Sequence, residues 1–204
     1  LACFVLAFLA IRWRRHDTTF VTIAWLGAIG LAWGAFLVAT PHNHEPSVDD
    51  RRQVAHIMST YRDRGYSVAS VDAGVIPFVS RWRTLDSAGL NDPHIGRNGL
   101  DQMYWDSYNP ALVMQPTYTL DPLGERARQN RKASYEIMRA RGDYVPVAIV
   151  DIAERYNSRF GRYNAYFLRR DLPEFEEIAA MLSSLDDQSY VEIPQAFSDY
   201  FSGR

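Results

Sequence analysis

An uncharged, largely apolar run covers residues 18–40, and it limits what this chain can fold into more than any other feature. A helix of that length crosses a hydrocarbon core of roughly 30 Å. Residues 1–11 are equally apolar but too short to span such a core, so we interpret them as a second helix cut at its start. The sequence therefore predicts one or two N-terminal transmembrane helices within residues 1–40, the first of them truncated.

A short loop at residues 12–17 separates the two apolar runs and contains Arg12, Arg14 and Arg15. Positively charged short loops stay in the cytoplasm, so the chain after residue 40 is predicted to lie outside it. A cleaved signal peptide is the alternative, but the positive cluster follows the first apolar run, and no small-residue cleavage site follows Thr40. We expect a multi-pass cell-membrane protein, in contact with membrane lipid, whose C-terminal domain is extracytoplasmic.

The remainder of the chain, residues 41–204, is mildly acidic. The whole sequence has 22 basic and 24 acidic residues, and removing the three arginines and one aspartate of residues 1–40 leaves 19 and 23, a net charge of about −4. No basic excess exists to neutralise phosphates, so nucleic acid is not an expected partner. The only cysteine, Cys3, lies in the apolar segment, and no disulfide can form within the chain.

Residues 41–204 alternate between helical and strand patterns. After a capping-box sequence that starts at Ser47, an apolar face recurs at helical spacing until Gly65, which is expected to end the helix. Strands are predicted at residues 66–71, 83–86, 111–114, 144–151 and 163–169, and further helices at 121–141, at 151–156 and from Asp171 onward. Turns and a weak apolar run near Val191 are predicted for the tail. This alternation predicts one small α/β domain with a mixed sheet over residues 41–204.

Two short apolar runs each end in an aspartate followed by glycine, which predicts two strands that stop at tight turns. Polar groups crowd these turns, and the candidate substrate-binding residues are Asp72, Gly74, Asp86, Asn91, Asp92, His94 and Arg97. An arginine fork suits carboxylate or phosphate oxygens, and a histidine can donate to a sugar hydroxyl. Ordinary turn chemistry uses the same residue types, and the alternative is an Asp92–Arg97 pair that only fixes the loop.

No standard catalytic motif occurs after residue 40: there is no Gly-rich phosphate loop, zinc-binding helix or nucleophile elbow. A glycoside hydrolase needs two facing carboxylates, and the candidates are Asp72, Asp86 and Asp92. Aspartates before turns commonly accept hydrogen bonds from their own backbone amides, which favours structural roles for at least two of them. The aromatic residues Tyr104, Trp105 and Tyr108 either stack on sugars or, more commonly, pack in the core.

Two charged features have ordinary explanations. His42 and His44 lie in a polar linker without the fixed geometry that a metal ion needs, so no metal site is predicted there. The arginine-rich helix at residues 121–141 either faces anionic headgroups or is simply solvated, and the solvated face is the favoured interpretation.

The segment after the second apolar run resembles the stretch that follows the last membrane helix in bacterial polytopic glycosyltransferases of the GT-C superfamily. The matching pieces are residues 72–78 (DAGVIPF), the Leu85-Asp86 pair and residues 89–95 (GLNDPHI). Those enzymes use polyprenyl-phosphate sugars and include arabinofuranosyl- and mannosyltransferases of bacterial envelopes. The resemblance implies that this chain is the C-terminal part of such an enzyme, which transfers the sugar to an envelope glycan, and that its outer domain helps to bind this acceptor.

The resemblance also implies that the catalytic acidic residue lies upstream of Leu1, in an early extracytoplasmic loop, so no catalytic residue is assigned here. No cofactor or metal is assigned to this part of the chain, and the sequence leaves open whether a divalent metal assists the full-length enzyme. The alternative function is a non-enzymatic, membrane-anchored domain that binds glycan or a partner protein. An envelope glycan hydrolase is a third and weaker idea.

Overall fold

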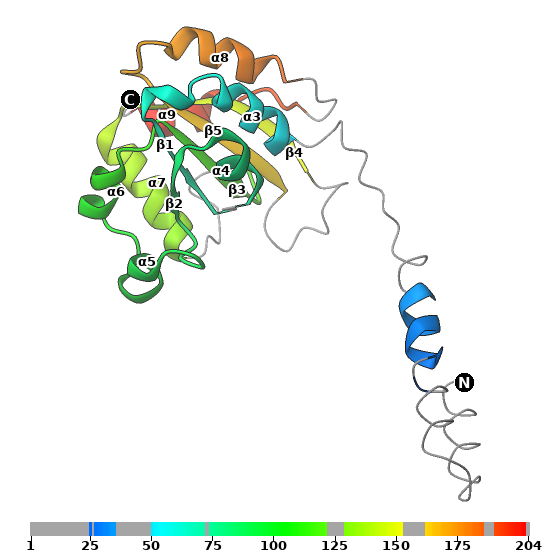
Figure 1. Cartoon of the computed structure of the whole chain (residues 1–204). Helices are drawn as coiled ribbons and strands as arrows, with labels where there is room; N and C mark the ends of the chain where they lie inside the picture. The colour runs from blue at the N-terminus through cyan, green and yellow to red at the C-terminus, as the bar shows by residue number, and fades with distance from the viewer. Residues whose placement is uncertain are drawn as a thin grey trace, which may run out of the picture. The chain divides into compact units, whose positions relative to one another are not determined.

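The computed structural model describes residues 25, 27–35, 50–71, 74–121, 129–152, 162–185 and 190–202, and the chain divides into two units, Leu1–Pro46 and Ser47–Arg204 (Figure 1). In the first unit residues 27–35 are helical, and Ile29, Leu31 and Trp33 are exposed. No helix among the described residues is long and apolar enough to cross a membrane. The predicted helix at 1–11, the loop at 12–17 and both ends of the run at 18–40 lie outside the described residues.

The second unit is built on one five-stranded sheet with the strand order β2-β1-β3-β5-β4. Strand β1 is parallel to β2 and β3, whereas β5 is antiparallel to β3 and β4, so the predicted α/β class with a mixed sheet is confirmed. The elements in chain order are α3 (Asp50–Ser59), the 3-10 helix η2 (Arg62–Arg64), β1 (Ser67–Ser70), α4 (Val75–Ser80), β2 (Arg83–Asp86), α5 (Pro93–Asn98), α6 (Gln102–Tyr108), β3 (Leu112–Thr117), α7 (Gln129–Arg141), β4 (Tyr144–Asp151), β5 (Tyr163–Arg169), α8 (Phe175–Ser183) and α9 (Gln195–Ser202).

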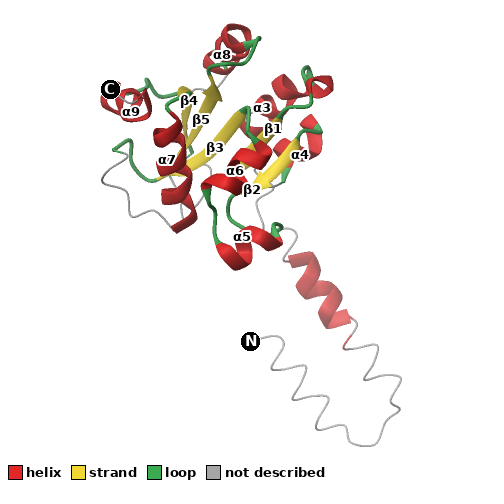
Figure 2. Cartoon of the chain, turned by 90° about the vertical axis from the view of Figure 1, so that its left-hand side faces the viewer, coloured by secondary structure: helices red, strands yellow, loops and turns green. Residues whose placement is uncertain are grey.

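Helices cover both faces of this sheet (Figure 2). Helices α3, α4 and α8 lie on one face, where Met58, Ile76 and Leu182 pack on strand residues such as Leu112. Helices α5, α6, α7 and α9 lie on the other face, where the buried apolar residues are Ile95, Trp105, Met138, Phe197 and Phe201. Because both faces are covered, β1 and β3 are buried along their whole length.

Strands β1 and β2 are joined by a helix where the sequence predicts only a turn. Parallel neighbours cannot be joined by a tight turn, because the chain must return to the starting edge of the sheet. Helix α4 makes that return, beginning after Gly74, whose carbonyl accepts a hydrogen bond from the Phe78 amide at 3.2 Å. Pro77 lies in the first turn of this helix, where its missing amide hydrogen breaks no intrahelical bond.

Several predicted boundaries are also wrong. Helix α3 ends at Ser59, and Gly65 instead ends the following 3-10 helix with φ 69°. Asp171 does not cap α8, which begins after Glu174; the Asp171 carboxylate pairs with Arg169. Helix α9 occupies a tail for which turns and a weak apolar run, but no helix, are predicted. Burial of Phe197 and Phe201 in the core stabilises this helix, and local sequence signals do not reveal it. Residues 122–128 and 153–161 lie outside the described residues, so the start of the predicted 121–141 helix and most of the 151–156 helix do too.

The first residue of α3 ties the helix to the sheet. Asp50 is fully buried, and its carboxylate accepts hydrogen bonds from the Asn164 amide at 2.9 Å and the Tyr166 hydroxyl at 2.6 Å. Both partners belong to β5, far along the chain. The capping-box pattern in the sequence therefore marks the start of a helix, but the Asp50 side chain acts in a tertiary contact that the pattern does not reveal.

Tyr66 makes the stability of the fold sensitive to alkaline pH. Burial, followed by the hydrogen bond and negative charge of Glu174, raises the pKa of Tyr66 to about 12, and Glu174 is held in turn by Arg64 at 2.8 Å. A phenol whose pKa is higher in the folded than in the unfolded state stabilises the fold fully below pH 10 and loses that contribution as pH rises through 12.

We therefore expect Tyr66→Phe to lower the free energy of unfolding by about 1–2 kcal/mol at neutral pH. Between pH 10 and 12 the variant should lose less stability than the parent protein, so the two curves converge. Urea unfolding across this pH range measures both effects, with the exposed Tyr190→Phe as control. If the stabilities of the variant and the parent protein fall in parallel between pH 10 and 12, the raised pKa of Tyr66 is contradicted.

Candidate functional site

The turn after β2 is organised by the carboxylate of Asp86, the last residue of that strand. One oxygen, Oδ1, accepts the Ala88 amide at 3.0 Å, and the other, Oδ2, accepts the Asn91 amide at 2.7 Å. Asp86 is buried, and Asn91 is exposed at the tip of the turn. The aspartate therefore holds the backbone so that the Asn91 side chain is presented to solvent.

Two glycines let this turn fold back on helix α5. Gly89 has φ 73°, and a Cβ placed on it would lie 2.8 Å from the backbone nitrogen of Gly96. A Cβ on Gly96 would in turn lie 2.9 Å from the carbonyl oxygen of Gly89. Only two residues without side chains permit this approach, which explains both glycines of the motif at residues 89–96.

Asp92 connects the turn to helices α5 and α6. Its Oδ1 caps α5 by accepting the amides of His94 and Ile95 at 3.0 and 3.2 Å, with Pro93 as the first helical residue. The Tyr104 hydroxyl of α6 donates to the same carboxylate, 3.1 and 3.0 Å from its two oxygens. Asp92 makes no ion pair with Arg97 within the described part of the chain, so the alternative in which these two residues fix the loop is not supported.

Two tyrosines of α6 lie next to this turn. The Tyr104 ring stacks on His94 with centroids 4.0 Å apart, and Tyr108 lies tilted against it at 5.4 Å. The Tyr108 hydroxyl, burial and the Asp92 carboxylate together raise the pKa of Tyr104 well above its ordinary value, so this phenol stays protonated and donates to Asp92. The Arg83 guanidinium covers the Tyr108 ring at 3.9 Å.

These elements enclose a pocket of about 340 Å³ beside the edge strand β2. Its lining comes from α4, β2, the turn, the start of α5, and α6, and consists of Pro77, Thr84, Asp86, Asn91, Asp92, Pro93, Tyr104 and Tyr108. Carboxylate, amide and aromatic groups thus line one hollow. This combination suits a ligand that has hydroxyl groups on one side and an apolar face on the other.

The structure brings together three of the seven predicted site residues, Asp86, Asn91 and Asp92. Gly74 begins α4, His94 packs on Tyr104, and Arg97 is exposed on α5, so none of these lines the pocket; Asp72 lies outside the described residues. Thr84 is a pocket residue that nothing in the sequence signals, and Pro77 lies in the 72–78 stretch of the resemblance but is not among the predicted site residues. The two tyrosines were signalled only by the aromatic stretch in which they lie.

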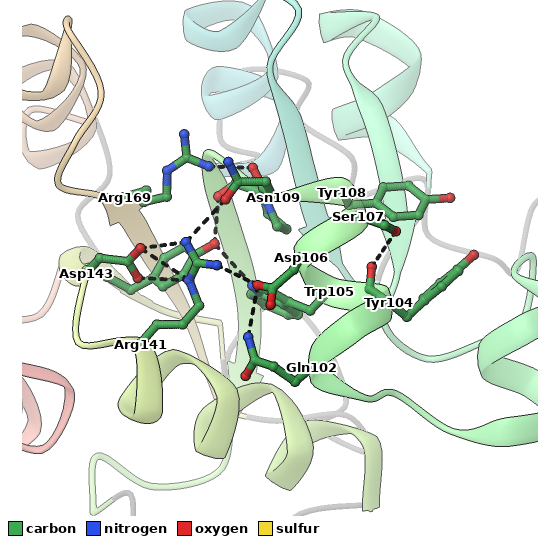
Figure 3. A network of polar contacts seen from close by, with 12 residues as sticks. Gln102, Tyr104, Trp105, Asp106, Ser107, Tyr108, Asn109, Arg141, Asp143 and Arg169 are labelled. Atoms are coloured by element: carbon green, nitrogen blue, oxygen red, sulfur yellow. Dashed lines mark hydrogen bonds and ion pairs between the residues drawn. The ribbon is translucent and has the colours of Figure 1, made fainter.

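A polar network anchors the opposite side of α6, away from the two tyrosines (Figure 3). Arg141, at the end of α7, pairs with Asp106 of α6 and Asp143, each at 2.6 Å. Beside it the Trp105 indole donates to the Tyr144 hydroxyl at 3.2 Å. Arg141 therefore serves a structural role rather than facing headgroups, and the network fixes the helix that carries the pocket tyrosines.

Neither pocket aspartate is arranged as a catalytic acid or base. Asp86 and Asp92 each accept two backbone amides, so both carboxylates already stabilise the turn and the helix start. Within the described residues no group of three or more His, Cys, Asp or Glu side chains could hold a metal ion. The geometry favours ligand binding over hydrolysis.

The family described as "Domain of unknown function (DUF8728)" matches residues 41–180. No curated protein and no solved structure matches the chain. The matched residues include all five strands and every residue that lines the pocket. Because the match covers more than half of the chain, the protein belongs to this family.

Proposed function

We propose that this chain is the C-terminal part of a membrane glycosyltransferase of the GT-C superfamily, and that the pocket beside β2 binds the acceptor glycan. The full-length enzyme would transfer a sugar from a polyprenyl-phosphate donor to an envelope glycan. The observation that carries the binding role is the pocket itself, which Tyr104 and Tyr108 line together with Asp86, Asn91 and Asp92.

The chemistry of the lining fits a neutral sugar. Carboxylate oxygens accept hydrogen bonds from sugar hydroxyls, and the Asn91 amide both donates and accepts. The Asn91 side chain makes no hydrogen bond with any other described residue, so it is available to a ligand. No basic side chain lines the pocket, which disfavours phosphate or carboxylate ligands, and its volume of about 340 Å³ suits one or two sugar rings.

The transfer role rests on the resemblance around residues 72–95 and on the N-terminal sequence. The exposed apolar side chains of the 27–35 helix support membrane attachment, because such residues favour an apolar environment over water. The arginines of the 12–17 loop support an extracytoplasmic position for the second unit. The catalytic acid would lie upstream of Leu1, which agrees with the structural roles of Asp86 and Asp92.

A non-enzymatic, membrane-anchored glycan-binding protein is the second candidate. The observation that favours it is that both pocket carboxylates are engaged by backbone amides, which leaves a binding site without a catalytic set. The two candidates share the pocket and differ only in whether transfer occurs.

Calorimetric titration with neutral envelope-glycan fragments tests the binding role. Asn91→Ala should weaken binding about tenfold, because it removes hydrogen bonds to the ligand without touching the backbone contacts of the turn. Gln195→Ala is the matched control, since Gln195 is an exposed amide side chain on α9 and does not line the pocket. Equal affinities for the two variants would refute the pocket as the glycan site.

A transfer assay separates the two candidates. Protein that includes the residues upstream of Leu1 would be incubated with a polyprenyl-phosphate sugar and the glycan that binds. Sugar transfer that falls in Asn91→Ala but not in Gln195→Ala supports the enzyme. Binding without any transfer would support the anchored glycan-binding protein instead.

A further inference from the structure

Three large apolar side chains are exposed on segments that also line the pocket. Phe78, Leu90 and Met103 are 72%, 84% and 80% exposed, and we call them the apolar rim. They come from α4, the turn after β2 and α6, and each is the sequence neighbour of a pocket-lining residue: Pro77, Asn91 and Tyr104 respectively. Single exposed apolar residues are ordinary, but three on the segments that form one pocket are typical of an interaction surface.

The same segments carry three exposed arginines, Arg81, Arg83 and Arg97. The Arg81 guanidinium lies 5.4 Å from the Phe78 ring, and Arg83 lies over Tyr108. Within the described part of the chain none of the three forms an ion pair with a carboxylate.

We propose that this face docks on an anionic lipid surface. The apolar rim would lie at the boundary between headgroups and acyl chains, and the three arginines would bind lipid phosphates. Charge complementarity selects this occupant: guanidinium groups without acidic partners suit phosphates, and apolar side chains among them suit acyl chains. Residues 41–204 are acidic as a whole, so the attraction is local to this face. The inference holds whether or not the pocket binds a glycan.

The two edges of the sheet provide a matched test. The full chain with Cys3→Ser would carry one cysteine labelled with an environment-sensitive dye, either at Leu90→Cys beside β2 or at Tyr190→Cys. Tyr190 is also exposed, but it bridges to Val150 of β4, at the other edge of the sheet. The protein is bound to vesicles of phosphatidylcholine alone or mixed with phosphatidylglycerol, both containing a nitroxide-labelled lipid as quencher.

We expect strong quenching at position 90 in the anionic vesicles only, and little at position 190 in either. Arg97→Gln should lower the ratio of docked to undocked protein about fivefold, the effect of one arginine near an anionic surface. Attachment through residues 1–40 alone would give vesicle binding without quenching at position 90, and it would overturn the proposal. Equal quenching at position 90 in neutral and anionic vesicles would also overturn the proposal. So would a dye at position 90 whose environment changes only when a protein partner is added.

Discussion

Replacing Trp105 by alanine should lower the free energy of unfolding by about 3–5 kcal/mol, the range observed for large aromatic residues removed from a packed core. Trp105 is fully buried on α6, packs edge-on against Tyr144 with centroids 5.9 Å apart, and donates its indole N–H to the Tyr144 hydroxyl. The substitution removes the ring, its hydrogen bond and the main anchor of the helix that carries the pocket tyrosines. Glycan binding should therefore fall with stability.

Met103→Ala is the matched control for this substitution, because Met103 lies on the same helix and is 80% exposed. Its effect on stability should stay within about 0.5 kcal/mol, as for most surface changes. Urea unfolding followed by circular dichroism compares the two variants. If Trp105→Ala lowers the free energy of unfolding no more than Met103→Ala does, α6 is not anchored through the Trp105 indole.

Replacing Gly89 by alanine should lower the free energy of unfolding by about 2–4 kcal/mol and weaken glycan binding. Two effects add at this position. The backbone has φ 73°, which L-residues with a Cβ adopt at a cost, and the new Cβ would lie 2.8 Å from the Gly96 nitrogen. The turn must open to relieve the contact, and Asn91 would then leave its place in the pocket.

Gly65→Ala separates these two effects. Gly65 has nearly the same backbone conformation, φ 69°, but nothing lies within 4 Å of an added Cβ. The Gly65→Ala variant should lose only the free energy of unfolding that corresponds to the backbone strain, about 1–2 kcal/mol, and its glycan affinity should stay unchanged. Thermal or urea unfolding and the same calorimetric titration measure both variants. If Gly65→Ala is as damaging as Gly89→Ala in stability and binding, the contact between Gly89 and Gly96 has no special role.

Local sequence signals located most strands because they report on a few consecutive residues. Short apolar runs bounded by turn residues identified the five strands, and helix α7 ends at Arg141 as expected, followed by Gly142 with φ 67°. The signals failed where an element depends on distant partners. Helix α4 exists because β1 and β2 are parallel, and α9 exists because Phe197 and Phe201 pack on Phe167.

The candidate site follows the same division. The turn residues Asp86, Asn91 and Asp92 were identified from the sequence, because the density of polar residues between glycines is a local property. The Asp92–Tyr104 hydrogen bond and the stacking of His94 on Tyr104 join different helices, and no local pattern predicts them. His94 in particular was expected to face a ligand and instead stacks on Tyr104, which lines the pocket.

The sequence by itself determined the α/β class, the apolar N-terminal run and the polar turn after β2, since each depends on residue type and short-range spacing. Only the tertiary structure decided that β2 is an edge strand and that α4 and α6 flank it. The order of strands in a sheet is set by long-range packing on its two faces, which a local pattern does not encode. Because β2 is an edge strand, the polar turn that follows it becomes part of a pocket.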